Sequence, residues 1–149
     1  MLILSITLLT KIKRHAEAEY PHECCGAIIG TLDGDNKKVM HIEPIQNNWE
    51  DTGDETKTRR FMISGEDYQA MEKKASALNA ILWWFSHPHP DPPPIPSETD
   101  LTFAWPFFSY PIMTVKKGND AEIKSYVLDL ETNEFKSEAI FFKNGKSVK

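Results

Sequence analysis

The first twenty residues combine two hydrophobic periods. Leu2, Leu4 and Ile6 occupy alternate positions, which predicts a short strand. From Thr7 onward the apolar positions change to helical spacing, and Pro21 ends the predicted helix. The positions expected to share one helical face are Leu8, Leu9, Ile12, Ala16 and Tyr20. The chain is therefore expected to begin with a strand that runs into a helix.

The next segment has the pattern of a hairpin followed by a polar loop. Residues 25–32 (CGAIIGTL) and 37–45 (KKVMHIEPI) predict two strands, and the Asp33-Gly34 pair supplies turn chemistry between them. Residues 46–58 are polar and nearly free of apolar spacing, which predicts a loop.

A second helix is expected after Ser64. RFMI (60–63) predicts a strand that stops at this serine, and Ser64-Gly-Glu-Asp67 is a capping signature. The helix should run to about Leu78, with its apolar positions toward the core. These inward positions are Tyr68, Met71, Ala75 and Leu78.

The second half of the chain predicts mainly strands. ILWWFSH (81–87) has the length and aromatic content of a buried strand, and a proline-rich loop and a short helix from Ser97 follow it. Strands are expected at 109–116, 122–129 and 135–142, with a Gly118-Asn119 turn between the first two. Helices mixed with largely sequential strands predict an α/β (α+β) fold, a sheet flanked by helices, in one domain over residues 1–149.

Composition narrows the class of protein. The chain has 149 residues, of which 40% are hydrophobic, enough for a single buried core. Its net charge of −5 argues against nucleic-acid binding, which needs a clustered basic face. The two cysteines, Cys24 and Cys25, are neighbours and make a poor cross-link, so we expect small buried thiols in a reducing compartment.

The apolar N-terminal run does not have the pattern of a targeting segment. Its charges follow the run instead of preceding it, and about ten residues are too few to span a bilayer. We therefore expect a cytoplasmic protein with no membrane partner. Nothing in the sequence predicts its oligomeric state.

The segment after the aromatic strand has the spacing of a metal clasp. His87 and His89 lie at positions i and i+2, so on an extended segment both rings point to the same face. Each is followed by a proline, Pro88 or Pro90, which pushes the preceding residue into the extended region. Two imidazoles can therefore reach one ion.

A carboxylate follows at a useful distance. Asp100 lies one turn into the helix that Ser97 can cap, so these two residues share a face. If the proline-rich loop folds back, His87, His89 and Asp100 make a three-ligand site with an open position for water, the pattern of a catalytic zinc site. Such a ligand set also accepts other first-row metals.

Each piece also has an ordinary structural interpretation. Ser-Glu-Thr-Asp at 97–100 is a common capping box, and histidines beside prolines are often surface residues. The run PDPPPIP at 90–96 could be a polyproline ligand for a signalling domain or a stiff loop. The joint occurrence of two histidines, serine and aspartate at this spacing favours the metal site.

HPHPDPPPIPSETD resembles the H-x-H-x7-S-x-x-D signature of the JAMM (MPN+) metalloprotease family. PHECCGAIIG resembles the second landmark of that family, a glutamate that leads into a strand of small residues. The order of elements is similar to that of compact stand-alone prokaryotic members over almost the whole chain. The resemblance implies a single MPN/JAMM-like domain with a mixed sheet.

The resemblance also implies a role for each matching residue. His87, His89 and Asp100 would bind one Zn²⁺ per chain, with water as the fourth ligand. Glu23 would be the general base, and Ser97 would hydrogen-bond the developing oxyanion. Only the flanking match selects Glu23 over Glu17 or Glu19; the spacing of the residues does not.

The implied reaction is hydrolysis of an amide or isopeptide bond at the C-terminal tail of a ubiquitin-like or sulfur-carrier protein. Trp49, a lone aromatic in a polar loop, is the candidate substrate contact, and the 46–58 loop could supply one wall of the tail-binding site. Two alternatives remain. One is a non-catalytic MPN scaffold with the same fold, and the other is a proline-motif ligand.

Overall fold

The structure is a computed structural model of residues 1–149, and it describes residues 1–20, 22–50, 63–86, 94, 96, 107–116 and 120–143. At 83–86, 116, 120 and 121 only the backbone is described. Several predicted features lie outside this part of the chain: most of the strand at 60–63, the clasp at 87–90, the helix from Ser97 and the turn at 118–119.

The described residues form ten helices and strands, and most of the predicted ones are confirmed. In chain order they are β1 Leu2–Ser5, α1 Ile6–Glu19, β2 Cys25–Asp33, β3 Asn36–Ile45, α2 Gly65–Ala77, β4 Ile81–Ser86, β5 Tyr110–Lys116, β6 Asp120–Asp129, β7 Glu134–Glu138 and β8 Ile140–Lys143.

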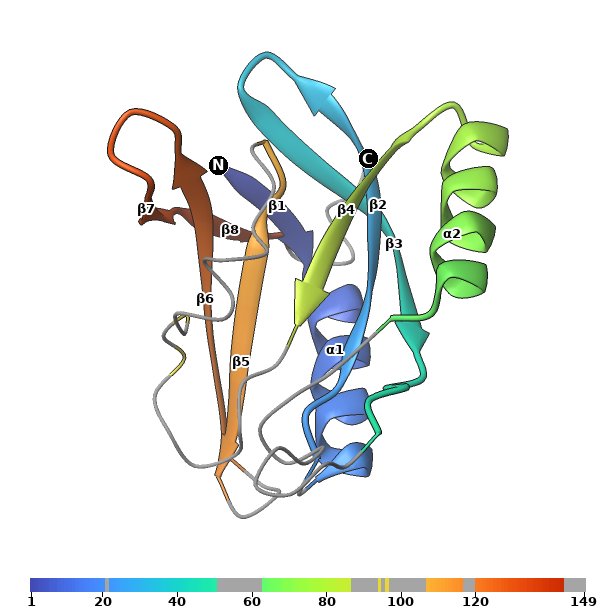
Figure 1. The fold of residues 1–149 in the computed structure, drawn as a ribbon. Helices are drawn as coiled ribbons and strands as arrows, with labels where there is room; N and C mark the ends of the chain where they lie inside the picture. Colours follow the sequence, from blue (N-terminus) through green and yellow to red (C-terminus); the bar gives the residue numbers. More distant parts are fainter. Residues whose placement is uncertain are drawn as a thin grey trace.

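The described strands form one eight-stranded mixed sheet in the order β7-β6-β5-β4-β2-β3-β1-β8 (Figure 1). The β2–β3 hairpin is antiparallel, and its turn residues are Gly34 and Asp35, one position later than the sequence predicted. Gly34 has a φ of 62°, which glycine adopts at little cost. Strand β4 pairs with β2 antiparallel and with β5 parallel, so it lies inside the sheet. The predicted mixed sheet flanked by helices is confirmed.

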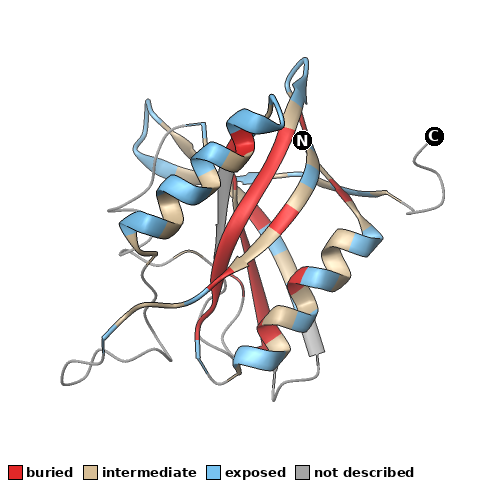
Figure 2. Cartoon of the chain, turned by 90° about the vertical axis from the view of Figure 1, so that its right-hand side faces the viewer, coloured by how far each residue is buried: buried red, intermediate tan, exposed pale blue. Residues whose placement is uncertain are grey.

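The first six residues of β2 are buried on both faces because one helix covers each side of the sheet (Figure 2). On one face, Ile28 belongs to the core cluster that contains Ile12 and Ala16 of α1. On the other face, Ala27 and Ile29 belong to the cluster that contains Ala75 of α2. The buried first part of β2 therefore anchors the start of the strand, where Glu23 leads in.

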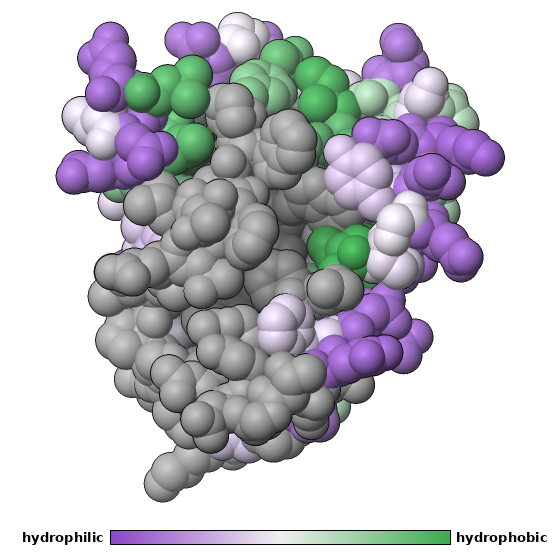
Figure 3. Space-filling model, viewed as in Figure 1, coloured by the Kyte–Doolittle hydropathy of each residue, from purple (hydrophilic) through white to green (hydrophobic). Residues whose placement is uncertain are grey.

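Both helices begin at a serine cap. The Ser5 hydroxyl accepts a hydrogen bond from the Leu8 amide at 3.1 Å, and Ser64 accepts one from the Asp67 amide at 3.1 Å. The side chains over the outward surface of α2, on the right in Figure 3, are mostly hydrophilic. The predicted capping signature at Ser64 is thus confirmed.

The inward position predicted for Leu78 is wrong. Helix α2 ends at Ala77, and Asn79 adopts a φ of 52°, the left-handed conformation common just after a helix. The Asn79 and Ala80 amides donate to the carbonyls of Ser76 and Ala75. The chain therefore turns before Leu78 can reach the core, and its side chain is 46% exposed.

The predicted strand at 135–142 is two strands at opposite ends of the sheet order. Strand β7 pairs with β6 antiparallel, whereas β8 pairs with β1 parallel, and only Ala139 separates them. The Ala139 carbonyl accepts a hydrogen bond from the Leu2 amide at 2.8 Å. The sheet must curl to bring its two ends together, and α1 packs within this curl (Figure 1).

In the described part of the chain, none of the helices is long and apolar enough to cross a membrane.

Candidate functional site

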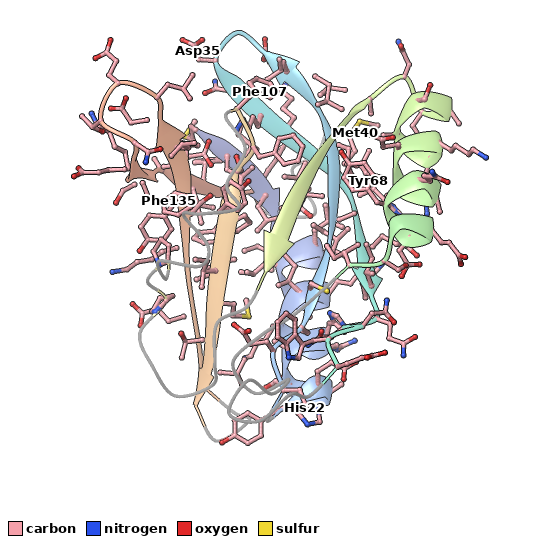
Figure 4. The ribbon with its side chains drawn as sticks, viewed as in Figure 1. His22, Asp35, Met40, Tyr68, Phe107 and Phe135 are labelled. Carbon is pink, nitrogen blue, oxygen red and sulfur yellow. The ribbon has the colours of Figure 1, made fainter. Side chains whose placement is uncertain are left out.

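Three strands of the sheet meet at the end where Glu23 lies. Cys25, the first residue of β2, pairs with Ile45 at the end of β3 and with Ser86 at the end of β4. Figure 4 shows His22 at this end of the molecule, far from Asp35 in the β2–β3 turn. The chain thus brings the residue before β2, the loop after β3 and the exit from β4 to one edge.

Glu23 is buried and its backbone is held in place. Its exposure is 9%, which is low for a carboxylate. The Asn47 side-chain amide donates a hydrogen bond to the Glu23 carbonyl at 3.0 Å. The same Asn47 side chain accepts one from the Trp49 amide at 3.0 Å. A single asparagine therefore ties the loop after β3 to the lead-in of β2.

Glu19 and Glu23, between which the spacing of the sequence could not choose, lie in different environments. Glu19 lies at the end of α1, where its side chain is 48% exposed and lies 3.7 Å from His15 Nε2. Glu23 instead lies in the buried lead-in to the central strand. Burial at a strand edge, next to the point where β4 ends, is the environment in which a carboxylate can serve as a base toward a reacting group.

Trp49 is partly buried, not fully exposed as a substrate contact would suggest. It lies in the described part of the polar loop, residues 46–50, which has no regular secondary structure. Its backbone is fixed through Asn47. A role for the indole in substrate binding stays a prediction.

The adjacent thiols are buried and protonated at neutral pH. Cys24 and Cys25 are 1% and 0% exposed, and neither is in a disulfide. Burial, followed by the charge of Glu23, raises the pKa of the Cys25 thiol to about 12. Burial also raises the pKa of Cys24, with smaller contributions from Cys25, Glu19 and Glu23. Their burial agrees with the expectation of small buried thiols.

The predicted ligands themselves, His87, His89 and Asp100, and the predicted oxyanion donor Ser97 lie outside the described residues. Within the described ranges, no group of three or more His, Cys, Asp or Glu side chains could hold a metal ion. His87 is the residue that follows β4, whose last residue, Ser86, pairs with Cys25. The donor set of two imidazoles and a carboxylate fits zinc, with buried Glu23 two residues before Cys25.

Asn47 is the site residue that sequence reasoning missed. It stands in the run Gln46-Asn47-Asn48, where nothing distinguishes one amide from the next. Only the pairing of Ile45 with Cys25 brings the residues after β3 next to those before β2. The sequence shows only that Asn47 is a polar residue just past the end of a strand, which does not identify Glu23 as its hydrogen-bond partner.

The sequence of the chain is similar to one protein family and to one named relative. Residues 5–129 match the sequence profile of the family described as prokaryotic homologs of the JAB domain. Tail tip assembly protein K of Escherichia phage N15 is 34% identical over 89 residues, which are 60% of this chain and 30% of that protein. The match thus covers less than a third of the length of this relative.

Two solution structures share the fold over nearly the whole chain. A protein from Desulfitobacterium hafniense has a TM-score of 0.81 and 24% identity, covering 97% of this chain and 94% of that one. A protein from Salinibacter ruber has a TM-score of 0.71 and 28% identity, covering 99% of this chain and 94% of that one.

Proposed function

The chain belongs to the prokaryotic homologs of the JAB domain, and we propose that it is a zinc-dependent peptidase of the JAMM type. The observation that carries the proposal is the position of Glu23. This carboxylate is buried, its backbone is held by Asn47, and it leads into Cys25, the partner of the last residue before His87. The proposed base therefore lies beside the end of β4, and His87 is the next residue after that strand in the sequence.

The proposed reaction is hydrolysis of an amide or isopeptide bond by water. A zinc ion held by His87, His89 and Asp100 would supply Lewis-acid polarisation and lower the pKa of the attacking water to roughly 7. Glu23 accepts a proton from that water and returns it to the leaving amine. Ser97 donates a hydrogen bond to the developing oxyanion, a contribution worth about 3 kcal/mol in comparable sites.

The proposed substrate is the C-terminal tail of a ubiquitin-like or sulfur-carrier protein. Such a tail is extended, and an extended peptide can be bound along a sheet edge or strand end. The described part of the 46–58 loop lies against Glu23 through Asn47, which supports its place as one wall of the tail-binding site. Trp49 would contact the tail from this loop.

The experiment that tests the base compares two matched glutamine variants. Glu23→Gln should retain bound zinc and lose most hydrolysis of a ubiquitin-like fusion, by about 100-fold or more, because the amide cannot accept the proton. Glu19→Gln is the control, since Glu19 is four residues away on an exposed helix end. Equal turnover of the two variants would reject Glu23 as the base.

A non-catalytic binding module is the second candidate. It is favoured by the name of the phage relative, a tail tip assembly protein, although the match covers only part of that longer chain. A binding module would need no zinc and no base. Absence of stoichiometric zinc together with full activity of the protein in partner binding would support this alternative.

A further inference from the structure

Three half-exposed hydrophobic side chains lie close together near the β2–β3 turn. Ile81 of β4 pairs with Gly30 of β2, and Leu32, two positions further along β2, shares their face of the sheet because side chains alternate. Leu32 pairs with Lys37 of β3, whose Nζ lies 5.0 Å from the centre of the Phe107 ring. Leu32, Ile81 and Phe107 are 43%, 37% and 50% exposed, and together they are named the turn-end patch.

The turn-end patch is at the end of the molecule away from Glu23. Figure 4 shows Phe107 at the same end as Asp35, with His22 at the opposite end. In Figure 3, hydrophobic residues gather at the top of the molecule, which is this end, with hydrophilic residues around them. The patch is therefore separate from the edge of the sheet that carries Glu23, and a role for it does not depend on the proposed hydrolysis.

Phe107 is held at the surface in a conformation that costs free energy. Its φ is 76°, a region that a bulky residue adopts only when its surroundings enforce it. Lys37 Nζ donates to the Phe107 carbonyl at 2.6 Å and to the Ser109 hydroxyl at 2.7 Å. Lys37 is 6% exposed, and Glu138 lies 3.8 Å from its Nζ. A strained backbone that presents a half-exposed aromatic ring is typical of a binding anchor and not of a core residue.

The β2–β3 turn places acidic residues next to the turn-end patch. Leu32 is followed by Asp33 and Asp35, both exposed. Asp33 pairs with Lys38 at 3.2 Å, whereas Asp35 is in no ion pair with a residue that the structure describes. One side of the patch therefore carries an uncompensated carboxylate.

The β6–β7 turn adds acidic residues at the same end of the molecule (Figure 1). Tyr110, three residues after Phe107, contacts the Phe135 ring with centroids 5.5 Å apart, which brings the start of β7 close to the start of β5. Glu131 in the turn and Glu134 at the start of β7 are both exposed. Neither lies within ion-pair distance of a lysine or arginine in the described ranges.

The charge and the size of this surface decide which occupant suits it. The lysines of the two turns are already paired, Lys38 with Asp33 and Lys136 with Asp129. A second copy of the chain would bring acidic residues against acidic residues, and an anionic membrane surface would be repelled as well. A stable interface between two folded proteins uses roughly 20–30 residues on each side, far more than this patch offers. A short basic segment with apolar side chains fits both the charge and the size.

We propose that the turn-end patch binds a short basic peptide segment of a partner protein. Apolar side chains of the segment pack on Leu32, Ile81 and Phe107, and its lysines or arginines lie near the acidic residues of the two turns. Phe107 is the anchor, because buried aromatic contacts carry most of the binding energy in such surfaces. Since the carboxylates are exposed, binding weakens as the salt concentration rises.

The test uses two short fluorescein-labelled helical peptides with leucines at the same positions. One has lysine at its polar positions and the other has glutamate. Fluorescence anisotropy should show binding of the leucine–lysine peptide and none of the leucine–glutamate peptide. Phe107→Asn should raise the dissociation constant of the leucine–lysine peptide about tenfold. Asparagine adopts a positive φ more readily than phenylalanine, so this loss of binding should come without a loss of thermal stability.

Three further variants complete the test. Leu32→Gln removes an apolar contact without changing Phe107 and should raise the dissociation constant about fivefold, which keeps the proposal testable if Phe107→Asn is destabilised. Asp35→Asn should raise it about threefold. Glu66→Gln is the matched control, because it removes an exposed carboxylate at the end of α2 that lies away from the β2–β3 turn (Figure 1), and it should leave the affinity unchanged.

Several results would overturn the proposal. One is the absence of binding to the wild type, and another is equal affinity of the wild type, Phe107→Asn and Leu32→Gln for the leucine–lysine peptide. Equal binding of the two peptides would reject a basic partner. A dimer in sedimentation velocity that dissociates on Phe107→Asn would assign the patch to a second copy instead. Binding to vesicles of anionic phospholipid that the same variant abolishes would assign it to a membrane surface.

Discussion

Replacement of Asn47 by alanine tests whether the Glu23 lead-in is held by the loop after β3. The variant loses two hydrogen bonds of 3.0 Å, one to the Glu23 carbonyl and one from the Trp49 amide. At about 1 kcal/mol each, the free energy of unfolding should fall by about 2 kcal/mol. For a protein of this size that is a decrease of roughly 4–8 °C in Tm.

Asn48→Ala is the matched control because the neighbouring amide makes only long contacts. Its Nδ2 lies 3.4 Å from the Gln46 carbonyl and 3.4 Å from Asp67 Oδ2. Long, partly exposed hydrogen bonds contribute little, so this variant should lose no more than about 0.5 kcal/mol. Both variants make the same change from asparagine to alanine, so they differ only in the hydrogen bonds that are lost.

The assay is thermal and urea unfolding of both variants, followed by hydrolysis of a ubiquitin-like fusion. Asn47→Ala should lower kcat, because Glu23 is the proposed base, and should also raise KM, because the same asparagine holds the backbone of Trp49, the proposed substrate contact. If Asn47→Ala unfolds at the same temperature as Asn48→Ala, the inferred support of Glu23 by Asn47 is incorrect. If it is destabilised but keeps full kcat, the support does not serve catalysis.

Two further predictions concern the caps and the thiols. Ser64→Ala should cost about 1 kcal/mol, since the hydroxyl caps α2 through the Asp67 amide; exposed Ser76→Ala is the control in denaturant unfolding, and equal losses would contradict the cap. Cys24 and Cys25 should resist alkylation at pH 8 in the native protein, and rapid labelling would show that they are not buried. Because the pKa of Cys25 is raised to about 12, the unfolded chain loses that proton first, so stability should fall as pH rises above roughly 8.5.

Local patterns predicted most of the fold because each depends on neighbours in sequence. The alternation in β1, the serine cap of α2 and the strand pattern of β2 are all short-range signals, and the structure confirms them. The inward position predicted for Leu78 is wrong because Leu78 fits the helical spacing, while the turn at Asn79 does not appear in that spacing.

Long-range pairing could not be predicted in the same way. Residues 135–142 look like one strand because nothing in the sequence marks Ala139 as the point of crossing. The division follows from Glu138, whose side chain is turned to Lys37 and Ser125, and from the Leu2 amide that binds the Ala139 carbonyl. These partners lie up to 137 positions apart in the chain.

In the candidate site, too, local sequence patterns identify some residues and strand pairing identifies others. Spacing and a family resemblance select His87, His89, Asp100, Glu23 and Ser97, and these assignments remain predictions. Asn47 carries no motif, because it acts on the Glu23 backbone, a distant segment, through one polar atom. Such residues become visible only when strand pairing is known.

The most direct test of the account is the zinc content of protein purified without a polyhistidine tag or chelator, compared between wild type and His89→Ala. Elemental analysis should find about one zinc per chain in the wild type and little in the variant, with both proteins folded. Equal zinc in the two proteins, or none in either, would contradict a metal site built from His87, His89 and Asp100.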